Sequence, residues 1–133
     1  RRGYLYSKAK ELGCNKVAYA HHKDDFIETM MMSMIYEGHF YCFPPKTYLD
    51  RIDLTIIRPF LYVEEADVIG FVHKYNLPVA KSPCPVDGST KREYADQLLK
   101  QLIRENKGVK ERLFSAIENG NIEGWQKGTF MPK

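Results

Sequence analysis

Chemically active side chains crowd one short segment of this chain, at His21, His22, Asp24, Asp25, Glu28 and Thr29. Carboxylates in such a cluster could bind Mg²⁺, orient a substrate or act as a general base. A structural alternative is that Asp25 caps a helix and forms a capping box with Glu28, which would contribute about 1 kcal/mol. That alternative explains one or two acidic residues but not the paired histidines as well. The segment is therefore predicted to be a functional site.

Two predicted elements flank this segment. The apolar run 16–20 predicts a buried strand, and apolar residues at helical spacing over 26–36 predict a helix. In open α/β sheets, ligands bind outside the carboxyl ends of the strands. The segment is thus expected at a strand-to-helix junction of the kind that binds ligands.

The rest of the chain alternates between helical and strand patterns. Helices are predicted over 1–12, 64–75, 89–106 and 109–118, a strand over 53–61, and a long loop or small hairpin over 38–52. This order predicts an α/β fold with parallel strands, followed by C-terminal helices. Two clear strands make a poor sheet, so we expect that part of the domain is missing from the sequence.

The chain is expected to divide into three regions. Residues 1–88 would form the C-terminal half of the α/β domain, residues 89–119 a helical segment, and residues 120–133 a loosely ordered tail. The methionine-rich stripe over 30–34 is predicted to pack in the core. The inward face of the helix over 89–106 is predicted to consist of Leu98, Leu99, Leu102 and Ile103.

The three cysteines, Cys14, Cys42 and Cys84, are an odd and scattered set, which argues against a disulfide scaffold and favours a reducing cytoplasm. Cys14 is expected to be a small buried hydrophobic residue. Cys84 lies between two prolines, where it could be a nucleophile or one metal ligand. A single cysteine cannot hold a zinc ion or an iron–sulfur cluster.

The charge pattern permits a polyanionic partner without requiring one. The net charge is +3, and the basic residues over 91–112 alternate with acidic ones, which favours a solvated helix face. No apolar run approaches the ~20 residues that a membrane-spanning helix needs. The sequence also contains neither G-x-G-x-x-G nor G-x-x-x-x-G-K-[ST], so it offers no recognisable phosphate loop.

Several short motifs occur together in a fixed order along the chain: Arg1-Arg2-Gly3, His21-His22-Lys23-Asp24-Asp25, Phe43-Pro44-Pro45-Lys46, Ile57-Arg58-Pro59 and Pro83-Cys84. The ordered set resembles the tRNA 2-thiocytidine synthetase branch of the PP-loop ATPases, which adenylate a base and then replace its oxygen by sulfur. The histidine–aspartate motif alone would also fit a lysidine synthetase, a PP-loop ligase that needs no cluster. A non-catalytic module that binds nucleic acid is the third interpretation.

The resemblance implies a partial Rossmann-like fold and assigns roles to the motif residues. The catalytic group would be His21, His22, Asp24 and Asp25, and the substrate-binding residues would be Arg1, Arg2 and Arg58. Cys84 would be one ligand of a [4Fe-4S] cluster, whose other two come from a Cys-x-x-Cys before Arg1. Many relatives carry a further cysteine where this chain has Asp87, which puts a second ligand from this loop in doubt.

The same resemblance implies what lies outside the chain. The family binds ATP on a Ser-Gly-Gly-x-Asp-Ser loop, which we expect upstream of Arg1 together with the Cys-x-x-Cys. The full enzyme would use ATP, Mg²⁺ and a [4Fe-4S] cluster, none of which this fragment is expected to bind alone. Its partners would be tRNA, a sulfur-donor protein, the missing N-terminal half and a second copy in a homodimer. Replacing Asp24 or Asp25 is predicted to abolish thiolation while folding survives.

Overall fold

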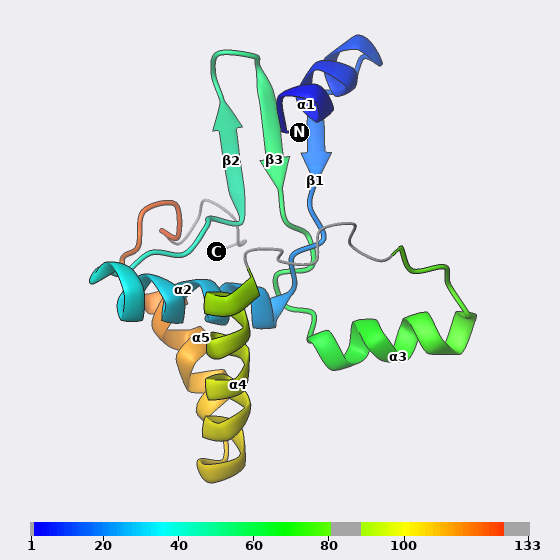
Figure 1. Ribbon diagram of the computed structural model, residues 1–133. Coiled ribbons are helices and arrows are strands. Elements are labelled where there is room, and N and C mark those ends of the chain that lie inside the picture. Colours follow the sequence, from blue (N-terminus) through cyan, green and yellow to red (C-terminus); the bar gives the residue numbers. More distant parts are fainter. Residues whose placement is uncertain (1, 81–88, 127–133) are drawn as a thin grey trace.

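The computed structural model describes residues 2–80 and 89–126, and everything said below of the structure refers to these residues. Its elements are α1 (Arg2–Glu11), β1 (Lys16–Ala18), α2 (Lys23–Glu37), β2 (Lys46–Leu49), β3 (Leu54–Ile57), α3 (Glu65–Tyr75), α4 (Ser89–Glu105) and α5 (Val109–Asn119). In Figure 1 the strands stand side by side on one side of α2, α4 and α5 lie on its other side, and α3 projects away from both groups.

The sheet has the order β1-β3-β2, with β3 in the centre. β1 pairs with β3 in parallel, with Val17 opposite Ile56, which confirms the predicted parallel pair. β2 pairs with β3 in antiparallel register, with Thr47 opposite Ile56. The small-hairpin alternative for 38–52 is therefore correct, and the expectation of parallel strands fails for this pair. A tight turn can only return the chain in the antiparallel direction, whereas a parallel return needs a long crossover.

The hydrophobic core lies between α2, α4 and α5. Phe26, Ile27, Met30 and Met31 of α2 are buried, which confirms core packing for these two methionines. They meet a set of buried residues from the C-terminal part of the chain, Leu99, Phe114, Ile117, Ile122 and Trp125. The C-terminal helices therefore share one core with the α/β part.

The segment after α5 is packed rather than loose. Trp125 is only 1% exposed, and its ring meets those of Phe26 and Phe114 edge to face. The indole Nε1–H donates a hydrogen bond of 3.3 Å to the carbonyl oxygen of Cys42. The prediction of a loosely ordered tail is thus wrong for residues 120–126, because one large aromatic side chain anchors this segment; residues 127–133 lie outside the described part.

Several residues predicted to be buried are open to solvent instead. Ile103 is 39% exposed, Cys14 is exposed, and β1 contains no buried residue. Helix α3 has no buried residue either, although its sequence is rich in apolar side chains. For α3 the reason lies in the arrangement of the elements, because no other described helix or strand packs along it.

Candidate functional site

The histidine–aspartate motif lies at the junction between β1 and α2, as predicted. Helix α2 begins at Lys23, and His22 is its N-cap residue. Asp25 is therefore the third helical residue and not the cap, which corrects the predicted capping box. Its Oδ2 accepts a hydrogen bond of 3.0 Å from the backbone N–H of His22, so the carboxylate still satisfies a donor at the helix start.

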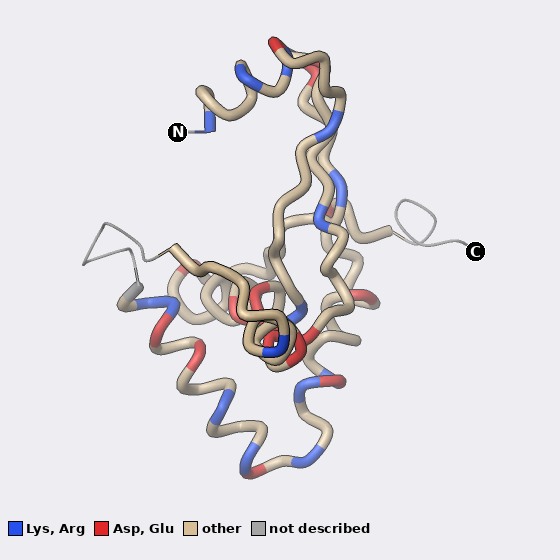
Figure 2. The backbone as a smooth tube through the Cα atoms, turned by 90° about the vertical axis from the view of Figure 1, so that its right-hand side faces the viewer, with Lys and Arg blue, Asp and Glu red and all other residues tan. Residues whose placement is uncertain are grey.

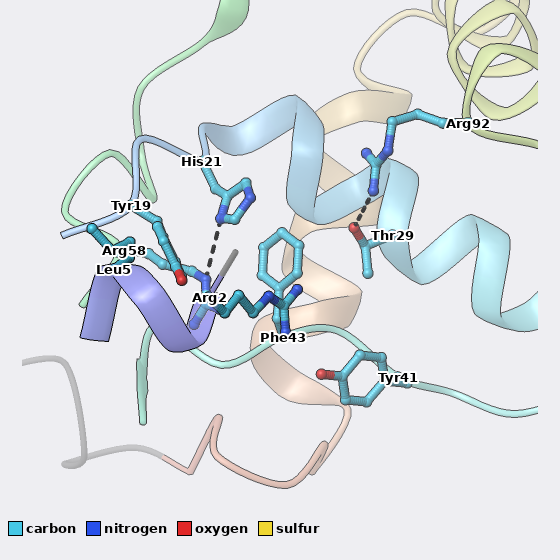
Figure 3. Close-up of a pocket in the computed structure, with 9 residues that line it drawn as sticks. All are labelled: Arg2, Leu5, Tyr19, His21, Thr29, Tyr41, Phe43, Arg58 and Arg92. Carbon is cyan, nitrogen blue, oxygen red and sulfur yellow. Dashed lines mark hydrogen bonds between the residues drawn. The ribbon is translucent and has the colours of Figure 1, made fainter. Parts of the chain in front are cut away.

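On one side of the motif, His21 faces a cavity of about 660 Å³. We call it the Arg58 pocket; its lining residues are Arg2, Leu5, Tyr19, His21, Thr29, Tyr41, Phe43, Arg58 and Arg92 (Figure 3). The lining combines aromatic rings with three arginines and contains no acidic side chain among the described residues. Such a wall suits a planar, negatively charged ligand.

Arg58 fixes the geometry of this pocket. Its Nε donates a hydrogen bond of 3.3 Å to Nδ1 of His21, and its Nη1 donates one of 2.7 Å to the carbonyl oxygen of Pro44. The guanidinium carbon lies 4.7 Å from the centre of the Phe43 ring, and the same ring stacks on His21 with 4.6 Å between centroids. Arg58 therefore holds the imidazole and the aromatic wall together.

The electrostatic surroundings keep His21 neutral. Burial lowers its pKa, and the positive charges of Arg58 and Arg92 lower it further against the opposing effect of Asp25. Because Nδ1 accepts a hydrogen bond from Arg58, the single proton of the neutral ring is assigned to Nε2. His21 can thus donate a hydrogen bond from Nε2 or exchange a proton there.

Asp24 is turned away from this pocket and joins three helices. Its Oδ2 lies 2.8 Å from Nζ of Lys110 in α5, and its Oδ1 accepts the backbone N–H of Glu65 at the start of α3. Burial alone would raise the pKa of Asp24, but the hydrogen bonds from Lys110 and Glu65 prevail and lower it. Asp24 is therefore ionised, and its two oxygens already have protein partners.

Asp25 faces a second cavity, of about 410 Å³, that we call the acidic cavity. Its lining residues are Asp25, Glu28, Glu65, Arg92, Glu93 and Asp96. Nε2 of His22 lies 3.4 Å from the Asp25 carboxylate and 3.5 Å from that of Glu65. The two adjacent histidines thus face different surroundings.

The predicted site residues are brought together only in part. His21, Arg2 and Arg58 line one pocket, and Asp25 lines the acidic cavity. His22 contacts the carboxylates of Asp25 and Glu65, and Asp24 belongs to the contact between helices. Arg1 and Cys84 lie outside the described residues. Arg92 was missed, because alternating charges on its helix pointed to a solvated face; Figure 2 shows that alternation along α4. Tyr19 and Tyr41 were also missed.

The described cysteines do not fit an iron–sulfur cluster. Cys42 is buried, its Sγ donates a hydrogen bond of 3.3 Å to the carbonyl oxygen of Phe26, and burial raises the pKa of its thiol. Cys14 is exposed, and it lines neither the Arg58 pocket nor another cavity near the motif. Within residues 2–80 and 89–126, no group of three His, Cys, Asp or Glu side chains could hold a metal ion. In the same residues, no helix is both long and apolar enough to cross a membrane.

Among the acidic residues of this region, Glu28 has the pKa that departs most from its ordinary value. Its side chain is 6% exposed, and burial raises its pKa to about 8. The charge of Asp96 and a hydrogen bond with it, together with the charge of Asp25, act in the same direction, whereas Arg92 opposes them. Glu28 is therefore largely protonated at neutral pH, although it accepts a hydrogen bond from Arg92 at 3.3 Å.

This perturbation predicts a pH-dependent stability. Between about pH 5 and pH 8 the folded state holds a proton on Glu28 that the unfolded state has released, so the free energy of unfolding should fall as the pH rises. Over that window the free energy of unfolding of the wild type should fall by roughly 2–4 kcal/mol. Glu28→Gln should abolish this fall, because glutamine does not titrate. Urea unfolding at pH 5, 6.5 and 8 measures it, with Glu93→Gln as the control at an exposed neighbouring position. Parallel pH profiles for wild type and Glu28→Gln would contradict the assignment.

Comparison with solved structures defines the class of protein. The fold is similar to that of the U34-tRNA thiolase NcsA from Methanococcus maripaludis, which was solved with its [4Fe-4S] cluster. The TM-score is 0.71 at 25% sequence identity, and the match covers 96% of this chain and 44% of the thiolase. The fold is thus that of part of a PP-loop tRNA thiolase.

Sequence comparison narrows the class. The chain is 40% identical over 125 residues to the tRNA-cytidine(32) 2-sulfurtransferase of Geobacter sulfurreducens, a match that covers 92% of this chain and 48% of the relative. The enzyme of the same name from Neisseria meningitidis is 38% identical over 122 residues, which is 38% of its length. No protein-family model matches the sequence. The resemblance to the 2-thiocytidine branch is confirmed, and the chain spans about half the length of the curated relatives named first.

Proposed function

We propose that this chain is the C-terminal part of an ATP-dependent enzyme that replaces an oxygen of a tRNA cytidine by sulfur. The observation that carries the proposal is the 40% identity, over 92% of the chain, to tRNA-cytidine(32) 2-sulfurtransferases. Cytidine 32 is therefore the proposed target. A lysidine synthetase-like ligase and a non-catalytic binding module are less well supported, because the similarity to thiolases covers nearly the whole chain.

The Arg58 pocket supports the binding of one nucleotide of an RNA. Its volume of about 660 Å³ lies in the range of small-ligand sites. Tyr19, Tyr41 and Phe43 offer aromatic faces of the kind on which unstacked bases pack. Arg2 and Arg58 supply positive charge beside them, which suits a phosphate or a developing negative charge on the base.

The motif residues take two kinds of role in this proposal. His21 is neutral and held by Arg58, and it would exchange a proton with the bound base. The Oδ2 atom of Asp25 is hydrogen-bonded to the backbone of His22, and its other carboxylate oxygen would bind the Mg²⁺ ion that accompanies ATP. Asp24 and His22 would act as positioning residues, because Asp24 pairs with Lys110 of α5 and His22 contacts the carboxylates of Asp25 and Glu65. Arg1 belongs to the same proposal as a substrate-binding residue.

The cofactors of the proposed reaction are ATP, Mg²⁺ and a [4Fe-4S] cluster. When bound, ATP supplies the adenylyl group that makes the base oxygen a leaving group, and the cluster carries the sulfur. Cys84 is proposed as one cluster ligand, and the phosphate loop and the other ligands would belong to the remaining half of the protein. A sulfur-donor protein would complete the system in the cytoplasm.

The uncovered surfaces indicate where that remaining half would pack. Helix α3 borders an apolar groove of about 490 Å³, lined by Phe60, Val63, Asp67, Val68, Phe71, Val72 and Leu77. Phe71 is 57% exposed, and β1 has a strand partner on its β3 side only within the described sheet. Parallel sheets are covered on both faces in folded proteins. We therefore propose that the other half of the same protein covers this groove and extends the sheet beyond β1.

Residues 1–133 on their own are predicted to self-associate. An open strand edge and an exposed apolar groove both promote pairing with a second copy. Light scattering of the isolated chain should give a mass above that of one copy, and Phe71→Asp in the groove should reduce it. A strictly monomeric chain at the highest soluble concentration would contradict the proposal that the groove and the strand edge are normally covered by the other half of the protein.

The proposed activity is tested with the protein expressed from its complete coding sequence. The protein is reconstituted anaerobically and incubated with unmodified tRNA, ATP, Mg²⁺ and sulfide, and the tRNA nucleosides are then analysed by mass spectrometry. We expect 2-thiocytidine that depends on ATP. Formation of lysidine or 2-thiouridine instead, or the absence of any modified nucleoside, would refute the proposed function.

A further inference from the structure

Arg92 is set apart from the other cations of α4 by its position. It lines both the Arg58 pocket and the acidic cavity, and its side chain is 41% exposed. In Figure 3 it reaches Thr29 from the side of α4, whereas Arg2 and Arg58 enter the pocket from the side of α1. A ligand in the pocket would therefore meet positive charge from two sides, with Arg92 at the edge that remains open to solvent.

The guanidinium of Arg92 is held by α2. Its Nη2 donates a hydrogen bond of 3.2 Å to Oγ1 of Thr29, and its Nη1 donates one of 3.3 Å to Oε1 of Glu28. Asp25 lies farther away, with 3.9 Å between its Oδ1 and Nη1. A long and flexible side chain is thus fixed in one orientation before any ligand arrives, which lowers the entropic cost of binding.

We propose that Arg92 binds a phosphate group of the substrate RNA at the rim of the Arg58 pocket, and that Glu28 and Thr29 position its guanidinium for this contact. The identity of the ligand rests on the proposed function. An RNA phosphate fits better than that of a small nucleotide because Arg92 lies at the solvent-exposed rim, which a neighbouring nucleotide of a polymer can reach while one base occupies the pocket.

The protonation of Glu28 decides how much of the Arg92 charge is available. A protonated Glu28 accepts the hydrogen bond from Nη1 without neutralising the guanidinium, and Asp96 shares in holding that proton. An ionised Glu28 would pair with Arg92 and compete with a phosphate. The other acidic groups of this cavity are Asp25, Glu65, Glu93 and Asp96. RNA affinity should therefore fall as Glu28 ionises, near and above pH 8.

The first test compares charge-removing variants on one helix. In the protein from the complete coding sequence, Arg92→Gln should weaken tRNA binding about tenfold and reduce the slope of log K against log salt by about 0.7–0.9. Arg104→Gln, an exposed position of the same helix outside both cavities, should leave both quantities unchanged. ATP affinity should be the same in all three proteins. Unchanged tRNA binding by Arg92→Gln, or a selective loss of ATP binding, overturns the inference.

The second test isolates the positioning role of Glu28. Wild-type tRNA affinity at constant salt should fall about threefold or more between pH 7 and pH 9, whereas Glu28→Gln, which keeps the hydrogen-bond acceptor without the charge, should bind equally well at both. A pH dependence that survives in Glu28→Gln overturns this part. Thiolation by the wild-type protein is measured in parallel. If the wild type thiolates tRNA and Arg92→Gln still binds tRNA normally, this inference is wrong and the proposed function stands. If the wild type does not thiolate tRNA, the proposed function is wrong.

Discussion

Replacing Arg58 by glutamine, in the protein expressed from its complete coding sequence, is expected to slow tRNA thiolation about 100-fold or more. The substitution removes the donor to Nδ1 of His21 and the cation above the Phe43 ring in one step. A misplaced proton-transfer group and a disordered base-binding wall each lower the rate by such factors. Thiolation rates with saturating tRNA and ATP measure the effect.

Two further variants sharpen this test. Arg58→Lys keeps the positive charge but cannot reproduce the paired hydrogen bonds to His21 and Pro44, so we expect an intermediate rate. Arg51→Gln removes the same charge from an exposed turn between β2 and β3 and should leave the rate unchanged. A wild-type rate for a folded Arg58→Gln would show that the pocket is not the reaction site.

The second large effect is on stability. Asp24→Ala is expected to lower the free energy of unfolding by about 2–4 kcal/mol, because it leaves the half-buried ammonium of Lys110 with Glu64 as its remaining partner and the first N–H of α3 without an acceptor. Asp25→Ala removes one contact at the start of α2 and should cost only about 1 kcal/mol. Urea unfolding followed by circular dichroism compares the two variants.

This contrast revises the expectation that either aspartate can be replaced while folding survives. Asp24→Asn keeps an acceptor for the N–H of Glu65, so it should lower the free energy of unfolding less than Asp24→Ala does. Combining Asp24→Asn with Lys110→Gln removes both charges, so the double variant should be more stable than the sum of the single losses implies. Equal destabilisation by Asp24→Ala and Asp25→Ala would contradict the structural role assigned to Asp24.

Local patterns were sufficient to place the motif at the junction of β1 and α2. An apolar run followed by apolar residues at helical spacing depends on neighbours along the chain, and both elements were found there with Met30 and Met31 in the core. The parallel pair β1–β3 also followed from the order of elements. The ordered motifs indicated the family, and the comparisons confirmed it.

Local sequence patterns could not predict the contacts between segments that are distant in the chain. Trp125 closes the core from a segment predicted to be loose, because a buried indole depends on partners as remote in sequence as Phe26 and Cys42. β1 and α3 are open although their sequences predict burial, since burial requires a covering layer that the described residues do not supply.

The sequence by itself placed the motif residues together at the start of one helix, and the tertiary structure decided how they divide between different surroundings. His21, Asp24 and Asp25 are near neighbours in the chain, yet they face the Arg58 pocket, Lys110 of α5 and the acidic cavity respectively. Side chains leave a helix start in different directions, so adjacency in sequence does not fix a common target. Only the packing of α4 and α5 against α2, with the hydrogen bond from the start of α3 to Asp24, sets those targets and brings Arg92 to the rim of the pocket.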